Sequence, residues 1–213
     1  MSAPKKISES VIRRLSLYLR ILESLERAGQ GTVSSEQLAN HSETTAAQVR
    51  KDLSLFGSFG KRGLGYGVPE LARRIRTILG LDRRWRVALV GVGRIGSALV
   101  EYSGFEERGY DIVAILDVDP SKIGAEWGDL TVNHITELEN IVRERSVEMV
   151  ILAVPVEAVP AVLDRVTCAG VRGILNFAPT TLRVPEGVTV KNVNMVMEME
   201  ALSFALSKEE GEE

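Results

Sequence analysis

The sequence has little cysteine and histidine and no long apolar run. Its 213 residues include one cysteine, Cys168, and two histidines. One thiol cannot form an internal disulfide, and no Cys/His cluster has the spacing of a metal site. No apolar stretch approaches the ~20 residues of a transmembrane helix, and the opening MSAPKKISES lacks the apolar core of a secretory signal. We therefore expect a cytoplasmic protein without a metal or a membrane partner, and Cys168 to be a buried, unreactive thiol.

Charge is divided unevenly along the chain. Residues 1–80 hold 13 Lys+Arg against 7 Asp+Glu, a net charge of +6, whereas residues 81–213 hold 13 against 22, a net charge of −9. The basic first part indicates a polyanionic partner, although a basic face in contact only with water would give the same asymmetry. The length suits two small domains. We predict domains at residues 1–80 and 81–193, followed at 194–213 by a C-terminal helix and a polar tail.

The first part has the pattern of a helix-turn-helix. Apolar residues three and four apart predict a long helix that ends at Gly29. Two short helices follow, because Ser34 with Gln37, and Thr45 with Gln48, have the spacing of a capping box. A long helix followed by two short ones joined by a tight turn is typical of DNA-binding domains.

The second short helix has an outer face suited to the DNA major groove. Val49, Leu53 and Phe56 share its buried side, so small, polar and basic side chains lie opposite them. Such side chains can reach base edges and permit close approach. Asp52 lies nearer the buried side, where we expect it to pair with an internal arginine. The predicted DNA-contacting residues on this helix are Thr45, Ala47, Gln48, Arg50, Lys51 and Ser54.

The glycine-rich segment SFGKRGLGYGVP predicts a β-hairpin, with Phe59 and Tyr66 on either side of its turn. In winged-helix proteins, the helix that enters the major groove is the recognition helix, and a basic hairpin that follows it is called the wing. Lys61 and Arg62 at its tip would contact the DNA backbone or the minor groove. We predict that residues 1–80 bind duplex DNA; a winged helix that serves protein contacts stays as the alternative.

A glycine-rich turn in the second part predicts a dinucleotide site. Gly91-x-Gly93-x-x-Gly96 lies between an apolar strand and a helix, and Asp117 ends the next strand. The glycines allow close approach of a pyrophosphate, and the acid would accept ribose hydroxyls and repel a 2′-phosphate, which favours NAD(H). Coenzyme A, or no ligand, remains an alternative. The predicted cofactor-binding residues are Gly91, Val92, Gly93, Arg94, Ile95, Gly96, Asp117, Lys122, Val154 and Phe177.

Strand and helix patterns then alternate to residue 193, which predicts a doubly wound parallel sheet with helices on both faces, a Rossmann domain. Val154 and Phe177 follow strands, at the edge where such sheets bind ligands, so a nicotinamide ring is expected there. An NAD-dependent dehydrogenase is the rival function. It would need an acid or base and a substrate domain, whereas His41 and His134 have the setting of surface or capping residues and no further domain remains. We predict no catalytic residue.

The segment MVMEMEALSFAL, residues 195–206, is apolar on nearly every side. Such a helix cannot keep its remaining faces in water, so we expect it to pack between two subunits of a homodimer. Burial within one subunit is the alternative.

With both parts described, the chain resembles the Rex family of redox-sensing transcriptional repressors. The match runs from about Ile7 to Leu206 and is most specific in TAAQVRKDLSLFGSFGKRGLGYG, VGVGRIGSAL, LDVDPSKIG and GILNFAP. The resemblance implies a homodimer of winged-helix and Rossmann subunits whose terminal helix is swapped into the partner. It also implies repression of fermentation and respiration genes from operator DNA when NAD+ dominates, and release from DNA when NADH rises.

The resemblance extends to single residues. It implies that Arg50 and Lys51 contact DNA from the recognition helix and Arg62 from the wing, and that Gly91, Gly93, Gly96 and Asp117 belong to the cofactor site. A network that couples cofactor to DNA binding would include Arg20 and Tyr102. Family members often have an acidic residue in that network where this chain has Asn194, which can hydrogen-bond but brings no charge.

Overall fold

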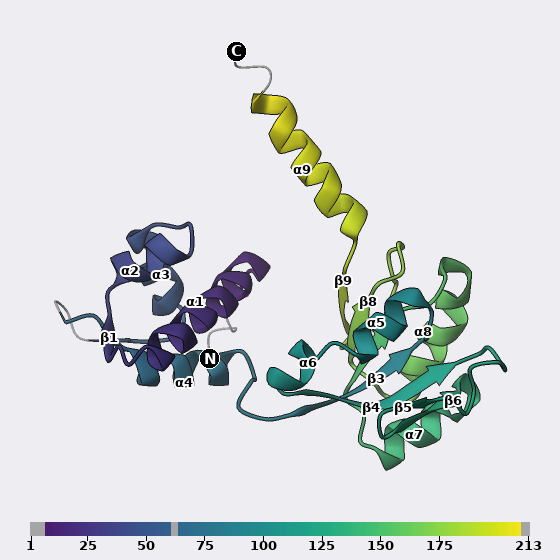
Figure 1. The fold of residues 1–213 in the computed structure, drawn as a ribbon. Helices are drawn as coiled ribbons and strands as arrows, with labels where there is room; N and C mark the ends of the chain where they lie inside the picture. The colour runs from purple at the N-terminus through teal and green to yellow at the C-terminus, as the bar shows by residue number, and fades with distance from the viewer. Residues whose placement is uncertain (1–6, 61–63, 210–213) are drawn as a thin grey trace. The chain divides into compact units, whose positions relative to one another are not determined.

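A computed structural model describes residues 7–60 and 64–209 of the chain (Figure 1). It divides into two compact units, Met1–Arg83 and Arg84–Glu213. None of the helices in the described ranges is long and apolar enough to cross a membrane.

The described residues of the first unit form four helices and two very short strands. Its core joins the apolar faces of the helices, with Leu15, Leu22, Val49 and Ile75 fully buried. The predicted helical face of the long first helix is confirmed. The elements are α1 (Glu9–Arg27), β1 (Thr32–Val33), α2 (Ser35–His41), α3 (Ala46–Ser54), β2 (Tyr66–Gly67) and α4 (Val68–Ile78).

The two short helices begin as the capping pattern predicts, with one difference. At α2 the Ser34 hydroxyl accepts the N–H of Gln37 at 3.1 Å, and the Gln37 carbonyl oxygen accepts the N–H of Ser34 at 2.9 Å. At α3 the Thr45 hydroxyl accepts the N–H of Gln48 at 3.1 Å, but the Gln48 amide donates to Asp52 instead of completing the box.

The predicted hairpin between Phe59 and Tyr66 has a turn that includes residues outside the described ranges, but strand β2 has a partner that the prediction did not include. Strand β2 pairs antiparallel with β1, so that Tyr66 lies opposite Val33. Gly65 makes this approach possible, because it has a φ of +78° and a β-carbon there would lie 2.6 Å from the Val33 carbonyl oxygen. The wing strand is therefore held by the segment between α1 and α2. Lys61 and Arg62 lie outside the described residues.

The second unit contains one twisted sheet with the strand order β5-β6-β4-β3-β7-β8-β9. Neighbouring strands from β6 to β9 are parallel, as predicted, and β5 pairs antiparallel with β6 at one edge. The strands β5 and β6 were missed because EWGDLTVNH has no continuous apolar run. The strands are β3 (Trp85–Val90), β4 (Tyr110–Asp117), β5 (Glu126–Trp127), β6 (Leu130–His134), β7 (Met149–Leu152), β8 (Gly173–Asn176) and β9 (Thr189–Asn192).

Helices lie on both faces of this sheet, although those on one face cover it only in part. On β3, Ala88 and Val90 pack with α7 and α8, whereas Val87 and Leu89 pack with α5 and α6 on the other face. This alternation is the period of two that a strand between two helical layers requires. The helices are α5 (Arg94–Val100), α6 (Gly104–Glu107), α7 (Leu138–Glu144) and α8 (Val159–Cys168), with 3-10 turns at Ile135–Glu137 and Val156–Ala158.

Cys168 is exposed, so the expectation of a buried thiol is wrong. Helix α8 buries the stripe formed by Val159, Val162, Leu163 and Val166. Cys168 lies at the last position of the helix, off that stripe, and its apolar sequence neighbours did not reveal this.

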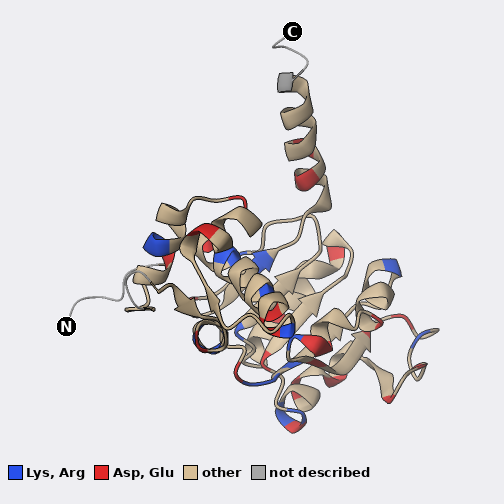
Figure 2. Cartoon of the chain, turned by 60° about the vertical axis from the view of Figure 1, so that its left-hand side comes forward, with Lys and Arg blue, Asp and Glu red and all other residues tan. Residues whose placement is uncertain are grey.

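The C-terminal helix α9 (Met195–Glu209) is exposed along its described length. Its large apolar residues each expose between 52% and 64% of their surface, so burial within one subunit does not occur in this chain. Figure 2 shows the helix mostly tan, with acidic positions near its start. These residues are Met195, Val196, Met197, Met199, Leu202, Phe204 and Leu206.

Candidate functional site

The three glycines of the fingerprint meet three different steric demands. Gly91 has a φ of +95°, and a β-carbon on it would lie 2.5 Å from the Ala153 carbonyl oxygen. A β-carbon on Gly96 would collide with the Gly91 carbonyl oxygen, so Gly96 lets α5 pack closely on the end of β3. At Gly93 a β-carbon would have no atom of the described chain within 4 Å. The turn is thus tight on its inner side and open at Gly93, which fits a pyrophosphate that approaches the backbone there.

Asp117 is almost completely buried and serves as a hydrogen-bonding centre for this turn. Its carboxylate accepts the N–H of Val92 at 2.7 Å, and those of Val118 and Asp119 at 2.7 and 2.9 Å. The Lys122 ammonium lies 3.2 Å from Oδ2. These four donors match the about four acceptor positions of a carboxylate, so Asp117 ties the glycine loop to the end of β4.

The same donors keep Asp117 charged. Burial alone would raise the pKa of this carboxyl, but the backbone N–H groups and Lys122 outweigh burial and hold its pKa below the usual value. The Lys122 side chain is partly exposed, so it is the donor that can move most easily to admit a ribose hydroxyl to Oδ2.

Asp119 is a candidate that the sequence analysis missed. Its side chain is 42% exposed, and its Oδ2 lies 3.6 Å from the Lys122 ammonium. It therefore presents a carboxylate on the outer side of the Asp117 cluster. The acidic pair Asp-x-Asp at the end of an apolar strand was the available signal.

The predicted residues Val154 and Phe177 lie at the same edge of the sheet. A β-carbon on Gly91 would lie 2.9 Å from a methyl group of Val154, and the Phe177 N–H donates to the Leu152 carbonyl oxygen at 2.8 Å. Strand order reverses between β3 and β7, so this is the crevice where doubly wound sheets bind nucleotides. Arg94 and Ile95 are exposed in the first turn of α5 beside it.

A buried amide, also missed, shapes the loop that carries Phe177. The side-chain amide of Asn176 donates to the backbone carbonyl oxygens of Ala178 and Thr180, both at 3.0 Å. It also donates to Oδ1 of Asn192 at 2.8 Å. Its own oxygen accepts the N–H of Ala178 at 3.0 Å. Asn176 therefore fixes the loop and joins β8 to β9.

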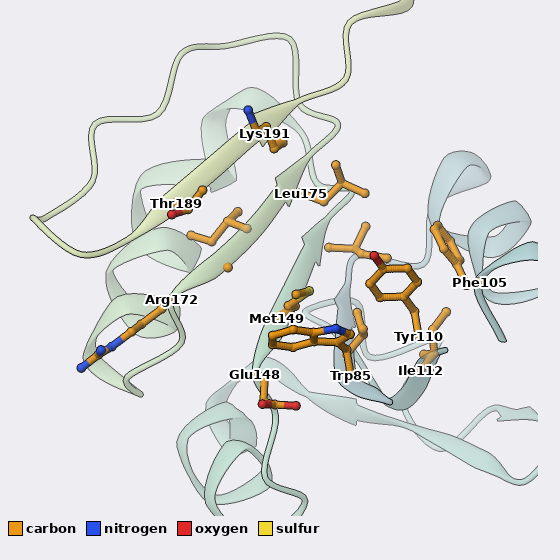
Figure 3. Close-up of a pocket in the computed structure, with 14 residues that line it drawn as sticks. Trp85, Phe105, Tyr110, Ile112, Glu148, Met149, Arg172, Leu175, Thr189 and Lys191 are labelled. Carbon is orange, nitrogen blue, oxygen red and sulfur yellow. The ribbon is translucent and has the colours of Figure 1, made fainter. Parts of the chain in front are cut away.

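A cavity of about 610 Å³ lies at the other ends of the strands, away from the glycine loop. Figure 3 shows Trp85 and Met149 in its middle, with Tyr110 on one side and Thr189 on the other. Its lining is mostly apolar and comes from the amino ends of β3, β4, β7, β8 and β9. The described connection from β8 to β9 contains no helix that could cover this face. We call this surface the sheet groove; its position suits a protein contact better than the nucleotide.

On α3 the predicted outer face is exposed, as its pattern indicates. Thr45, Ala47, Arg50, Lys51 and Ser54 are all exposed. The Arg50 guanidinium donates to the Ser35 hydroxyl at 2.8 Å, which links α3 to α2.

The inner side of α3 carries the ion pair that the sequence predicts. The Arg14 guanidinium donates to the Asp52 carboxylate at 2.6 and 2.8 Å, and the side chain of Asp52 is only 1% exposed. Arg14 lies on α1, so this pair fixes α3 against the longest helix of the unit.

The three residues assigned to coupling have separate settings. Arg20 is exposed on α1, in the first unit. In the second unit, Tyr102 packs edge to face on Phe105, with ring centroids 5.2 Å apart. Asn194 caps α9, because its side-chain oxygen accepts the N–H groups of Val196 at 3.0 Å and Met197 at 3.4 Å.

Both histidines have local structural roles, as the sequence predicts. His41 Nδ1 lies 2.7 Å from the Gln37 carbonyl oxygen, and His134 caps a 3-10 turn together with Glu137. In the described ranges, no group of three or more His, Cys, Asp or Glu residues could hold a metal ion.

Comparison with protein families divides the chain in the same way. Residues 6–54 match the family model described as "Putative DNA-binding protein N-terminus", and residues 82–180 match "CoA binding domain". Neither model alone covers half of the chain, so the full-length relatives decide the family.

A winged helix-turn-helix followed by a dinucleotide fold defines the class of transcription regulators that respond to a nucleotide. The chain is 48% identical over 204 residues to the redox-sensing transcriptional repressor Rex of Carboxydothermus hydrogenoformans, covering 96% of this chain and 98% of the relative. It is 48% identical to Rex of Thermus thermophilus, with 94% of each chain covered. The chain belongs to the Rex family of redox-sensing transcriptional repressors.

Solved structures agree. The Rex-family repressor RSP in complex with NAD+ and operator DNA has a TM-score of 0.91 and 35% sequence identity, covering 96% of this chain and 94% of that one. RSP in complex with NADH has a TM-score of 0.87 and 33% identity, with 97% of each chain covered.

Proposed function

We propose that this protein binds operator DNA as a homodimer when NAD+ dominates and leaves it when NADH binds. Residues 1–80 bind the DNA, residues 81–193 bind NAD(H), and residues 194–213 join the two subunits. The observation that carries the proposal is the combination, in one chain, of an open Gly93 turn beside a charged Asp117 with an exposed basic face on α3. The solved RSP complexes with NAD+ and operator DNA, and with NADH, support it. A cytoplasmic location, where operator DNA and the NAD(H) pool are both found, is part of this proposal.

In the nucleotide site each residue has a defined task. The backbone around Gly91, Gly93 and Gly96, with Val92, Arg94 and Ile95, receives the pyrophosphate. Asp117 and Asp119 accept ribose hydroxyls and, being charged, disfavour a 2′-phosphate. Val154 and Phe177 line the nicotinamide end. Lys122, the partly exposed donor to Oδ2 of Asp117, would give way there to a ribose hydroxyl.

NAD(H) supplies a ring whose positive charge is lost on reduction. The apolar side chains of Val154 and Phe177 disfavour a charged ring because they offer it no compensating hydrogen bond. The site can therefore hold the reduced form more tightly, and only such a difference in affinity between the two forms can shift the conformation of the protein. A coupling of about 1–3 kcal/mol is enough for a usable switch.

The exposed α9 supports the homodimer. Its apolar residues need a partner surface, and the sheet groove is an apolar surface that could receive side chains of a helix from a second copy. Because a dimer must reach two half-sites about 34–36 Å apart, a modest rotation between subunits moves the recognition helices out of register. The residues that would couple this rotation between subunits to the DNA-binding units are Arg20, Tyr102 and Asn194.

In DNA binding, Lys51 and Arg50 take the leading part on α3, with Thr45, Ala47, Gln48 and Ser54 around them. Arg62, with Lys61, serves the wing. Small side chains at position 47 and at position 54 allow the helix to enter the groove closely.

The decisive experiment titrates NADH into a protein–operator complex at fixed salt, followed by fluorescence anisotropy of labelled DNA. We expect NADH to release the DNA and NAD+ to retain it. Coenzyme A serves as a further control, because the family model of residues 82–180 carries its name. Equal effects of NADH and NAD+ would refute the proposal, and so would release by coenzyme A alone.

A further inference from the structure

A buried carboxylate lies directly behind the recognition helix. Asp52 accepts hydrogen bonds from Arg14 at 2.6 and 2.8 Å, from the Tyr18 hydroxyl at 3.0 Å and from the Gln48 amide at 2.7 Å. Two of these donors belong to α1, and Gln48 belongs to α3 itself, one turn before Asp52. The cluster therefore links the core of the domain to a side chain at the start of the recognition helix.

The chemistry of this cluster allows only one orientation of the Gln48 amide. Burial raises the pKa of Asp52, but hydrogen bonds from Arg14, Gln48 and Tyr18 outweigh it and keep its pKa below the usual value. Burial and the bond to Asp52 raise the pKa of Tyr18 to about 12, so its hydroxyl stays a donor. An ionised carboxylate can only accept hydrogen bonds. The amide nitrogen of Gln48 must face Asp52, and the amide oxygen must face away.

Gln48 is placed where a recognition helix reads bases. It is the third residue of α3, in the N-terminal part that enters the major groove in helix-turn-helix proteins. At about 100° per residue it lies between the buried Asp52 and the exposed Lys51. It is half-buried, so part of the residue remains accessible to a ligand.

The outward side of this amide offers one acceptor and one remaining N–H donor. Adenine presents the complementary pair in the major groove, an N6 donor and an N7 acceptor, and glutamine binds this pair with two hydrogen bonds. Guanine presents two acceptors there, which the fixed amide oxygen would oppose.

We propose that Gln48 reads an adenine in each half-site and that Asp52 is the positioning residue that fixes its amide for this task. This inference rests on the proposed function, because it requires α3 to enter the major groove. Asp52 itself contacts no base. Beyond a general DNA-binding role, Gln48 is thus assigned to one base, and Asp52 is assigned to the orientation of the Gln48 amide.

The test selects bound sequences from a duplex library with a randomised central segment, using full-length protein with NAD+. Wild type is compared with Gln48→Met, with Asp52→Asn and with the double variant. Gln48→Met keeps the length of the side chain and leaves the Arg14–Asp52 pair intact, so it tests the reading role even if Asp52→Asn folds poorly.

We expect Gln48→Met to lose adenine preference at one position of each half-site by about tenfold and to keep all other preferences. Asp52→Asn lets the amide rotate, so adenine preference at that position falls towards that of Gln48→Met. In the Gln48→Met background, Asp52→Asn then produces no further loss of base preference. A merely structural role of Asp52 would lower affinity for all sequences alike.

Three outcomes would overturn the inference or its basis. An adenine preference retained by Gln48→Met at every position refutes the reading role. An equal change of base preference by Asp52→Asn in the presence and absence of Gln48 refutes the positioning role. A wild-type protein that enriches no sequence refutes the proposed function itself, which separates that failure from the first two.

Discussion

Replacing two leucines on one side of α9 is expected to separate the subunits. Leu202 and Leu206 lie four residues apart and expose 52% and 54% of their surface in one chain. Burying the remaining half of a leucine contributes about 1 kcal/mol, and each leucine counts twice in a symmetric dimer. Leu202→Ser with Leu206→Ser therefore costs about 4 kcal/mol of association, which raises the dimer Kd about a thousandfold.

Sedimentation velocity over a range of protein concentrations measures this change. Glu200→Ser is the matched control, because it lowers helix propensity on the same helix without removing apolar surface. We expect the control to sediment as wild type, and the double variant to be monomeric at concentrations where wild type is dimeric. The reasoning fails if the double variant stays dimeric throughout, or if wild type is itself monomeric.

Three further predictions concern single residues. Lys51→Ala lowers operator affinity by about 1–3 kcal/mol at one base position; an equal loss on all sequences, seen with a reduced salt slope, would make Lys51 a phosphate contact. Gly93→Ala keeps the melting temperature, since Gly93 has a φ of −74°, but weakens NADH binding in fluorescence titrations, whereas Gly96→Ala lowers the melting temperature; equal melting of both variants contradicts this. The lowered pKa of Asp52 stabilises the fold above about pH 4, and this contribution is lost as pH falls through its folded pKa. Denaturant unfolding of wild type should therefore approach that of Asp52→Asn on acidification, and a constant gap would disprove it.

The parts of the fold that the sequence predicts well depend on local patterns. The Gly91 to Gly96 fingerprint, the apolar strands and the caps at Ser34 and Thr45 each act within a few residues, so spacing alone identifies them. The Arg14–Asp52 pair was predictable in kind, because Asp52 lies on the buried side of its helix and a buried charge needs a partner.

The errors concern contacts between distant segments. Tyr66 pairs with Val33, a residue far away in the sequence, and nothing within a two-residue strand identifies that partner. Most of the hydrogen bonds that Asp117 accepts come from backbone N–H groups of two separate turns, and no side-chain pattern reveals these donors. Cys168 shows the same limit, since its exposure is set by the face that α8 turns to the sheet.

Hydrogen bonds between β8 and β9 hold the start of α9, so a small tilt there displaces the far end of the helix by more. Asn176 bonds to Asn192, and its carbonyl oxygen accepts the N–H of Val193, just before α9 begins. The helix has 15 residues, or about 22 Å of length. A tilt of about 5° at its root would sweep its far end through about 2 Å, so a small displacement beside Phe177 becomes a large one at the tip.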